Sequence, residues 1–540
     1  MIFVPYQGSR RNARCSTPGV VVSATLRLTV LLLTLLIPTN LAIAGIEFVW
    51  CGAVTPNSAR FKAKVADEAA VVRIAYSNQP DLSDLSYSLP DTALLAVNNR
   101  VIDAAVSGLV QATTYNYLVE IDGVLDTLTR SRFMTFPEFG AGIFTIALGS
   151  CAATGSNHSV FQTIRAHNPL LFLHLGDFHY QNIAVNDASV FRAAYDVVLS
   201  SPNQSDLYRS TAVDYTWDDH DYGPNNSDST APGRAASRLT YQEYVPHYPL
   251  VAGTGNVPIY HTFTIGRAAF IVTDSRSSRS PASATDDSAK TMLGTNQKAW
   301  FKQQLLSLEG VYPLKVWVNT LPWIGTTGDD GWHLYTNERR ELATFIKDNG
   351  ITGLCMVSGD AHMLAIDNGA NSDYATGGGA GFPVFHAAAL DQSGSVKGGP
   401  YSHGAYPGRG QFGLMTVIDS GGASITVEWR GLTSTNTQRV AYSFTVTADP
   451  LPCDCSHHGD VSGNDARINV LDVTAIIDHV FRGGGRPVRD LVCPHLHRGD
   501  LNCDAVGDVI DVVLMIDVAF RGGAIPCIPC DCPPYPAICP

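Results

Sequence analysis

The chain has 540 residues, of which 45% are hydrophobic and 16% charged, a composition typical of folded globular proteins and not of disordered chains. Its net charge of −13 argues against nucleic acid as a main partner, because a phosphate backbone binds to clustered positive charge. The twelve cysteines divide the chain unevenly, with four before residue 450 and eight after it. A long cysteine-poor part is thus followed by a short cysteine-rich tail.

Residues 1–44 are predicted to form a cleaved secretory signal peptide. A lead that contains Arg10, Arg11 and Arg14 precedes an apolar run at 28–37, and Ala42-Ile43-Ala44 provides a small-x-small cleavage site. The run is too short to cross about 30 Å of hydrocarbon, which argues against a membrane anchor. We therefore expect a secreted, periplasmic or cell-surface protein without stable membrane insertion, in a compartment that permits disulfides.

Residues 45–137 are predicted to form an N-terminal β-sandwich. Short strands at 58–65, 71–76 and 115–121 alternate with turn-forming clusters such as Thr55-Pro56-Asn57-Ser58. A linker at 137–142 ends this region, and from 143 to 448 apolar strands alternate with helical patterns at 297–308 and 337–347. This alternation predicts an α/β domain.

Six apolar runs of the α/β domain end in polar residues. The runs are 144–148, 170–175, 213–217, 268–273, 314–318 and 354–357, and the residues that follow them include Cys151, Asp177, Tyr180, Asp218, Asp219, His220, Asp274, Asn319, Asp360 and His362. Each motif alone is more typical of a surface turn. Together they should converge, because ligands in open α/β sheets bind beyond the carboxyl ends of the strands.

Carboxylates packed together raise each other's pKa unless cations neutralise them, so these strand ends predict a site for more than one metal ion. Carboxylate and phenolate oxygens favour hard ions, whereas a thiolate and an imidazole suit iron or zinc. By contrast, Cys355 lies inside a strand and is expected to serve packing only, and Cys51 is expected to be free or, less plausibly, paired with it.

In their order along the chain, these motifs resemble the alkaline phosphatase D (PhoD-like) family of calcineurin-like metallophosphatases. The motifs are Cys151, Gly176-Asp177-x-x-Tyr180, Trp217-Asp218-Asp219-His220-Asp221, Asp274-Ser275-Arg276 and Ser358-Gly359-Asp360-Ala361-His362. The resemblance implies an α/β metallophosphatase sandwich at 143–448, preceded by a fibronectin-like β-sandwich at 45–137.

The resemblance also implies the site residues and cofactors. It places metal ligands at Cys151, Asp177, Tyr180, Asp219, Asp360 and His362, with Asp177 as a bridge, and it implies Fe³⁺ with Ca²⁺ as the metals and phosphomonoesters and phosphodiesters as substrates. Where the superfamily has a further ligand histidine this chain has Asn319, which we place with Arg279 among candidate substrate-binding residues.

Hydrolysis of a phosphoester requires a nucleophile opposite the leaving oxygen. A metal-bound hydroxide is expected to supply it, because metal binding lowers the pKa of water from 15.7 towards about 7. We expect His220 to stabilise the transition state or protonate the leaving oxygen, and Arg276 to hold a phosphoryl oxygen, unless Arg276 and Arg279 lie in a solvated loop. The alternatives are a non-catalytic extracellular scaffold or adhesion protein, and a phospholipase-like enzyme.

Residues 453–540 are predicted to form a small α-helical domain that resembles a dockerin-like tandem repeat. Two amphipathic patterns occur in this tail, and both end in Phe-Arg-Gly-Gly. The first consists of Val473, Ile476, Ile477, Val480 and Phe481, and the second of Val512, Met515, Ile516, Ala519 and Phe520. The acidic loop before each pattern has potential ligands at the spacing of an EF-hand calcium loop. The first loop contains Asp460, Ser462, Asp465 and Asp472 and is one residue longer than the second, which contains Asp500, Asn502, Asp504, Asp508 and Asp511.

The tail is therefore expected to bind Ca²⁺ in these loops. It would either dock to a cohesin-like partner domain or act as a stability module, and a plain helical hairpin with solvated acids is the simpler alternative. Its eight cysteines allow up to four disulfides in 105 connectivities, with zinc binding by Cys527, Cys530 and Cys532 as the rival interpretation.

Overall fold

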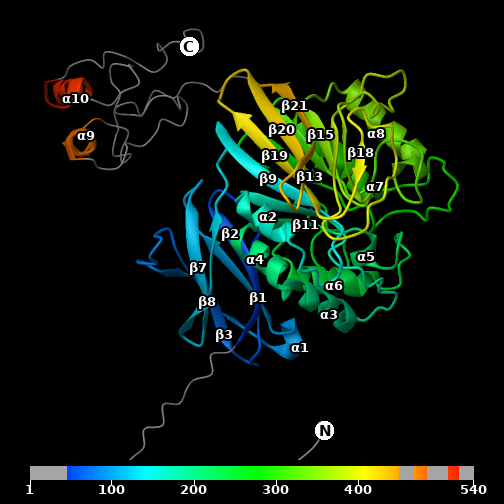
Figure 1. The fold of residues 1–540 in the computed structure, drawn as a ribbon, viewed down its shortest axis with the longest axis horizontal. Coiled ribbons are helices and arrows are strands. Elements are labelled where there is room, and N and C mark those ends of the chain that lie inside the picture. The colour runs from blue at the N-terminus through cyan, green and yellow to red at the C-terminus, as the bar shows by residue number, and fades with distance from the viewer. Residues whose placement is uncertain (1–44, 449–467, 469, 483–508, 522–540) are drawn as a thin grey trace, which may run out of the picture. The chain divides into compact units, whose positions relative to one another are not determined.

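A nine-stranded sheet forms the centre of the computed structural model, which describes residues 45–448, 468, 470–482 and 509–521 (Figure 1). Its strands are β1 (Ile46–Gly52), β2 (Ser58–Val65), β6 (Val101–Ser107), β9 (Gly142–Gly149), β10 (Leu171–Leu175), β11 (Ala212–Thr216), β19 (Gln411–Asp419), β20 (Ser424–Thr433) and β21 (Gln438–Thr447). They lie in the order β21-β20-β19-β9-β10-β11-β1-β2-β6, with β9, β10 and β11 parallel to one another.

A seven-stranded sheet packs against this first sheet. It consists of β12 (His261–Ile265), β13 (Ala268–Val272), β14 (Leu314–Val318), β15 (Leu354–Ser358), β16 (Met363–Asp367), β17 (Val384–Ala387) and β18 (Ala405–Pro407), in the order β12-β13-β14-β15-β17-β16-β18. The predicted apolar runs at 268–273, 314–318 and 354–357 are thus confirmed as strands. Apart from Lys315 in β14 and Thr273 after β13, these runs are apolar throughout, because both faces of a central parallel strand are covered.

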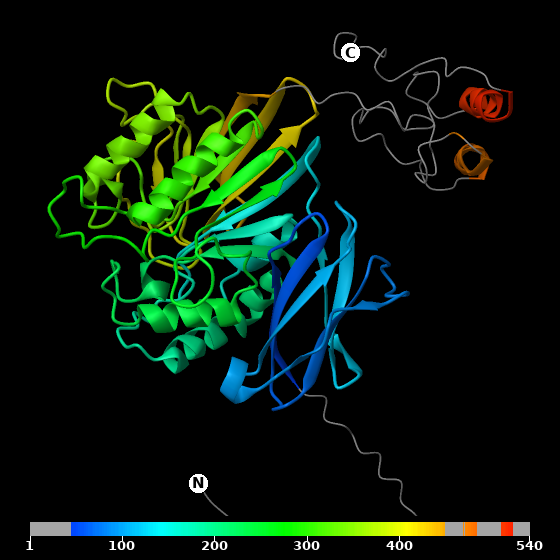
Figure 2. The same cartoon turned by 180° about the vertical axis from the view of Figure 1, so that it is seen from behind.

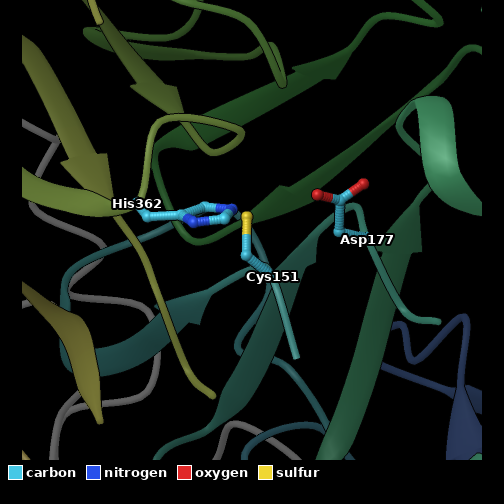
Figure 3. A group of neighbouring side chains, drawn as sticks. All are labelled: Cys151, Asp177 and His362. Carbon is cyan, nitrogen blue, oxygen red and sulfur yellow. The ribbon is translucent and has the colours of Figure 1, made fainter. Parts of the chain in front are cut away.

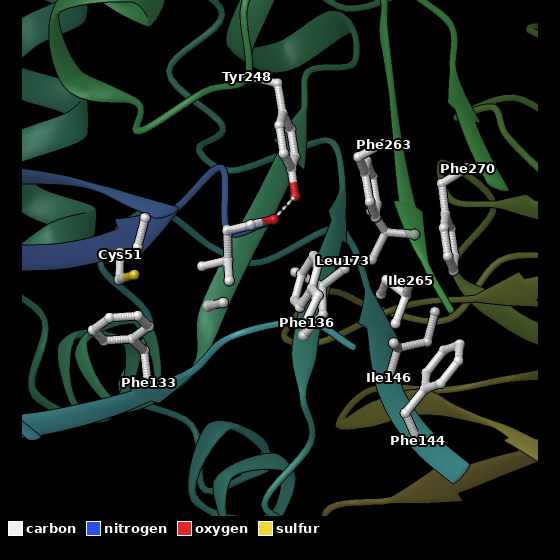
Figure 4. Packing of buried hydrophobic residues seen from close by; sticks show 14 of the residues in the cluster. Cys51, Phe133, Phe136, Phe144, Ile146, Leu173, Tyr248, Phe263, Ile265 and Phe270 are labelled. Atoms are coloured by element: carbon white, nitrogen blue, oxygen red, sulfur yellow. Dashed lines mark hydrogen bonds between the residues drawn. The ribbon is translucent and has the colours of Figure 1, made fainter. Parts of the chain in front are cut away.

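The core lies between the two sheets (Figure 4). Phe263 and Phe270 stack there with ring centroids 4.7 Å apart, next to buried Ile146 and Leu173 of the larger sheet. Burial of each such side chain contributes about 1.5–3 kcal/mol, so this layer is a main source of stability.

Helices cover the outer faces of both sheets, as the two opposite views show (Figures 1 and 2). They are α2 (Val160–Ala166), α3 (Ala188–Leu199), α4 (Pro202–Ser210), α5 (Asp219–Tyr222), α6 (Arg234–Tyr244), α7 (Gly294–Leu308), the 3₁₀ turn η1 (Trp332–Leu334) and α8 (Thr336–Asp348). Phe301 of α7 and Leu342 of α8 pack with Trp317 and Met356 of the smaller sheet. The helices predicted at 297–308 and 337–347 are therefore confirmed.

The N-terminal strands form a second pair of packed sheets. Besides β1, β2 and β6, the region contains β3 (Val71–Ser77), β4 (Ser86–Tyr87), β5 (Asp91–Thr92), α1 (Leu95–Asn98), β7 (Thr114–Ile121) and β8 (Val124–Met134). Phe61 of β2 contacts Tyr117 and Phe133 of the facing sheet, with ring centroids 4.9 and 5.4 Å apart. The strands expected at 58–65, 71–76 and 115–121 are present, whereas the fibronectin-like identity of this region remains a prediction.

The sequence suggests a boundary at 137–142, yet the strands on its two sides share one sheet. β1 pairs with β11 in parallel, through Gly52 and Val213. A side chain at Gly52 could not be accommodated, since its Cβ would lie 2.5 Å from the carbonyl oxygens of Val213 and Pro246. Glycine at this position therefore lets the N-terminal strands extend the larger sheet.

Two further helices, α9 (Val470–Arg482) and α10 (Val509–Arg521), pack against each other through Val473, Ile476, Val512 and Met515. The amphipathic helices predicted for the tail are therefore confirmed in part. Phe481 and Phe520, assigned to the packed faces by their spacing, are instead 61% and 62% exposed, because each lies at the penultimate residue of its helix, beyond the buried cluster.

Asp472 and Asp511, expected to close the calcium loops, lie in the first turns of α9 and α10 with fully buried side chains. The signal peptide, the other predicted calcium ligands (Asp460, Ser462, Asp465, Asp500, Asn502, Asp504 and Asp508) and the eight tail cysteines lie outside the described residues. Among the helices of the described residues, none has the length and apolar character needed to span a bilayer.

Candidate metal centre

Three of the predicted ligands follow strand ends in a left-handed backbone conformation. Cys151 follows β9, Asp177 follows β10 and Asp360 follows β15, with φ values of 63°, 55° and 54°. Residues other than glycine rarely adopt this conformation, and such local strain is typical of functional sites. The strand ends therefore turn sharply where their side chains meet.

A close approach of two chain segments brings the strand ends together. Gly176, with φ of 91°, lies so close to the next strand end that a Cβ on it would be 2.5 Å from the Cβ of Asp218. Glycine is thus required immediately before Asp177 for both its conformation and its packing.

Cys151, Asp177 and His362 form one group of potential ligands (Figure 3). One ligand atom from each lies within 4.8 Å of the other two. The hydroxyl of Tyr180 donates to Asp177 Oδ2 at 2.7 Å and lies 3.1 Å from Nε2 of His362. Because Nδ1 of His362 contacts the carbonyl oxygen of Ser393 at 2.6 Å, Nδ1 carries the proton and Nε2 is left as the metal-binding nitrogen.

Two more groups adjoin the first. Asp177, Asp219 and His220 form the second, and Asp218, Asp219 and Asp360 form the third, with the same 4.8 Å limit. Asp177 therefore belongs to two groups and so does Asp219. Shared carboxylates are the arrangement needed for neighbouring ions, as the sequence predicts for Asp177.

The donor set fits metal ions. Oδ1 of Asp177, Oδ2 of Asp218 and Oδ1 of Asp219 are buried oxygens that find no hydrogen-bond donor among the described residues. An unpaired buried carboxylate oxygen is costly. Arg276 already lies 2.7 Å from Asp218 and 3.8 Å from Oδ1 of Asp219, so the need for a further cation or a proton is clearest at Asp177. A buried thiol, a phenol and an imidazole nitrogen complete a set of oxygen, sulfur and nitrogen donors.

The ionisation of these groups supports the same interpretation. Burial raises the pKa of Asp177 well above its usual range, and the neighbouring Asp219 and Asp218 raise it further. Burial likewise raises the pKa of Asp360 to about 6, and it raises the pKa of the Cys151 thiol and the Tyr180 phenol. Without cations these groups favour their protonated forms, so metal binding and proton release are coupled.

His220 lies at the edge of this centre. Its Nδ1 contacts Oδ1 of Asn182 at 2.7 Å, and its ring lies over the ring of Tyr180 with centroids 4.2 Å apart. Burial lowers the pKa of His220, although Asp219 opposes this shift. Asn182 and Tyr180 thus fix the ring beside the predicted ligands.

Arg276 and Arg279 are fully buried, so the interpretation of both as residues of a solvated loop is wrong. Nε of Arg276 donates to Asp218 at 2.7 Å, and its Nη1 lies 2.8 Å from Asp330, which also contacts Arg279. Although burial alone would raise it, Arg276 and Arg279 lower the pKa of Asp330. Arg276 therefore lies beneath the carboxylates and orients them, which differs from its predicted contact with a phosphoryl oxygen.

The side-chain amide of Asn319 is engaged in hydrogen bonds with neighbouring segments. Its Nδ2 donates to the carbonyl oxygen of Leu321 at 2.5 Å, and its Oδ1 accepts from Trp332 at 3.1 Å. The Asn319 amide thus holds two neighbouring segments together inside the protein, and its expected substrate contact stays a prediction.

Three residues that contact the candidate centre are missing from the predicted site. Asp218 contributes a carboxylate to the third group, Asp330 pairs with both buried arginines, and Nζ of Lys397 lies 2.9 and 3.1 Å from the two oxygens of Asp360. Asp218 could have been found in its acidic motif. Asp330 and Lys397 lie in glycine-rich loops that carry no pattern of their own.

A separate cavity of about 970 Å³ lies at the opposite ends of the strands. Residues before and at the start of β9, such as Phe139 and Ile143, line it together with Leu170 and Ala212. Its lining contains none of the predicted site residues, so this cavity is separate from the candidate metal centre.

Comparisons with known proteins agree with this geometry. Residues 146–398 match the model of the PhoD-like phosphatase family. Alkaline phosphatase D of Bacillus subtilis (strain 168) is 24% identical over 315 residues, which are 49% of this chain and 54% of the relative, so the chain spans about half the length of that relative. The solved structure of PhoD has the same mixed α/β fold, with a TM-score of 0.62, 18% identity and coverage of 75% of this chain and 90% of that one. Residues 146–398 are therefore similar to PhoD-like phosphatases, and this matched range contains all the predicted metal ligands of the α/β domain.

Proposed function

We propose that the protein is an exported, metal-dependent phosphoesterase that hydrolyses phosphomonoesters, phosphodiesters or both. The observation that carries this proposal is the set of buried carboxylate oxygens on Asp177, Asp218 and Asp219 without hydrogen-bond partners among the described residues, next to Cys151 and His362. Such a set is costly in a protein that has no cation to place there.

The residues that would hold the metals are Cys151, Asp177, Tyr180 and His362 on one side and Asp218, Asp219 and Asp360 on the other, with Asp177 also grouped with Asp219. By resemblance to the family, Fe³⁺ and Ca²⁺ are the expected ions. When bound, they supply a water of lowered pKa as nucleophile and neutralise charge on the phosphoryl oxygens.

Residues around the candidate metal centre would position the substrate and the metal ligands. Asn182 and the Tyr180 ring hold His220, which is positioned to donate to a phosphoryl oxygen or to the leaving oxygen of the substrate. Arg276 acts as a positioning residue, because its contacts with Asp218 and Asp330 fix the carboxylates from beneath.

A non-catalytic scaffold is the less favoured alternative. A protein with no reaction to perform gains nothing from strained strand ends and from buried carboxylate oxygens without hydrogen-bond partners in the described structure, which cost stability. A phospholipase-like enzyme would use the same centre, so it differs only in substrate.

Export and tail function belong to the same proposal. The basic and apolar pattern of residues 1–44 supports secretion. The acidic loops before α9 and α10 support binding of Ca²⁺, and the dockerin-like pattern supports a cohesin-like docking partner.

The test is hydrolysis by the purified full chain of a monoester, a diester and a phospholipid, with and without a chelator. We expect turnover that the chelator abolishes and that added metal restores. Asp177→Asn should abolish it as well, whereas Asp67→Asn, at an exposed position of the N-terminal region, should leave it unchanged. A metal-loaded protein that hydrolyses none of the three esters would leave the scaffold interpretation standing.

A further inference from the structure

Lys397 lies on a loop that crosses the candidate metal centre between β17 and β18. The amide of Asp391 donates to the carbonyl oxygen of Cys151 at 3.0 Å, and the amide of Ser395 donates to that of His362 at 3.1 Å. The Tyr401 hydroxyl donates to the carbonyl oxygen of Lys397 itself at 2.9 Å. The loop is thus fastened to two predicted ligands, and the position of Lys397 is fixed by the site.

The ammonium group of Lys397 and the guanidinium group of Arg276 contact different carboxylates of the centre. Nζ lies 2.9 and 3.1 Å from the two oxygens of Asp360 and 3.5 Å from Asp329. The Lys397 side chain retains 18% exposure, whereas Arg276 is fully buried and uses its donors on Asp218 and Asp330. Of these two cations, only Lys397 is accessible to an incoming molecule.

We propose that Lys397 contacts a phosphoryl oxygen of the substrate and makes the enzyme prefer dianionic phosphomonoesters to monoanionic phosphodiesters. This inference rests on the proposed phosphoesterase function. A lysine ammonium is a compact point charge with three donors on a flexible stem, which suits it to a phosphate oxygen. If Asp360 held a metal ion, its oxygens would be shared with that ion, and a phosphoryl group would offer the Lys397 ammonium a further partner.

The charge of the substrate provides the selectivity. A monoester carries close to two negative charges above its second pKa of about 6, whereas a diester carries one. A fixed positive charge beside the phosphoryl group therefore stabilises the monoester more strongly. A diester also has one fewer non-bridging oxygen to accept from the ammonium.

The experiment compares Lys397→Met with Lys397→Arg and with Lys302→Met, a matched control on α7 whose ammonium pairs with Glu341. For each metal-loaded protein we would measure metal content, the affinity for inorganic phosphate by calorimetry, and kcat/KM for one monoester and one diester at pH 8. Lys397→Met should bind phosphate about 10- to 100-fold more weakly. Its ratio of monoester to diester kcat/KM should fall by about 10-fold.

The metal content of Lys397→Met should equal that of the wild type, and Lys397→Arg should keep most of the monoester preference because it keeps the charge. An unchanged phosphate affinity, or an equal loss for both esters, would overturn the assignment and leave Lys397 as a counter-ion of Asp360. If the wild-type protein hydrolysed neither ester, the proposed function would fail, and the phosphate titration alone would decide whether Lys397 binds the anion.

Discussion

The hydroxyl of Tyr180 donates a 2.7 Å hydrogen bond to Oδ2 of Asp177, while Oδ1 of the same carboxylate is buried and meets no donor in the described part of the chain. One oxygen of Asp177 therefore faces the group with Cys151 and His362. The carboxylate is also shared with the group of Asp219 and His220. Because the Asp177 carboxylate belongs to both ligand groups, we treat it as the bridge of the candidate centre.

Asp177→Asn should affect stability and activity in opposite directions. In the metal-free protein at pH 8 it removes a buried carboxyl group that folding must either protonate or leave charged without a cation, so the free energy of unfolding should rise by about 1–3 kcal/mol. With metal, turnover should fall by about 10³-fold or more, because the shared ligand is lost. Denaturant unfolding with and without chelator measures the change in stability, and initial rates of ester hydrolysis measure the change in activity. A variant less stable than the wild type in chelator would contradict the unpaired-charge argument.

Ferric iron in the centre should give a visible absorption band through the Tyr180 phenolate or the Cys151 thiolate. Tyr180→Phe and Cys151→Ser should each shift or weaken this band. Cys355→Ser is the matched control, since Cys355 is also a buried free thiol but lies inside β15. A colourless, iron-free and fully active protein would count against both ligand assignments.

Arg276→Met should be strongly destabilising. It leaves the buried Asp218 without its arginine and removes one of the two arginines that pair with Asp330, a loss that typically costs about 3–5 kcal/mol. Arg209→Met is the comparison, because Arg209 pairs with Asp206 on α4 where both side chains are about a third exposed, and such pairs contribute about 1 kcal/mol or less. Equal unfolding free energies for the two variants would refute the buried-network interpretation.

His174 of β10 should contribute to acid lability. It is enclosed by the rings of Phe172, Phe178 and Tyr215, and both its nitrogens lack hydrogen-bond partners within the described structure. Burial lowers its pKa to about 3, against about 6.5 in the unfolded chain. Since the unfolded state binds the extra proton, stability is full above pH 6.5 and is lost as the pH falls towards 3.

His174→Phe removes this proton-binding group while keeping an aromatic ring. Relative to the wild type, the variant should gain about 2 kcal/mol of stability between pH 8 and pH 5. Unfolding free energies at both pH values give the comparison. If the difference between the two proteins were the same at pH 5 and pH 8, His174 would not be buried in its neutral form.

The strands could be predicted from the sequence because central strands are short apolar runs with abrupt polar ends. The runs before Cys151, Asp177 and Asp360 coincide with β9, β10 and β15 to within two or three residues. Their convergence followed from the rule for parallel sheets. What local patterns could not predict was pairing over long distances, such as the parallel contact of Gly52 with Val213 that joins the N-terminal strands to the larger sheet.

The same limit applies to the candidate site. Asp330 and Lys397 occupy loops whose composition predicts only turns, and they acquire a role because distant segments bring Arg276 and Asp360 next to them. Asn319 shows the converse, since its place at a strand end suggested a ligand while its amide is occupied inside the protein. Side-chain orientation and long-range ion pairs are tertiary properties, which one strand end cannot reveal.

The most direct test of the metal-dependent phosphoesterase is a metal titration of the chelated full-length protein, with bound metal per chain and initial rate of ester hydrolysis measured on the same samples. The rate should rise from near zero in proportion to occupancy and saturate when the centre is filled, and Asp177→Asn should bind less metal and remain inactive. Full hydrolysis by metal-free protein, or a fully loaded protein that hydrolyses neither a monoester nor a diester, would contradict the account.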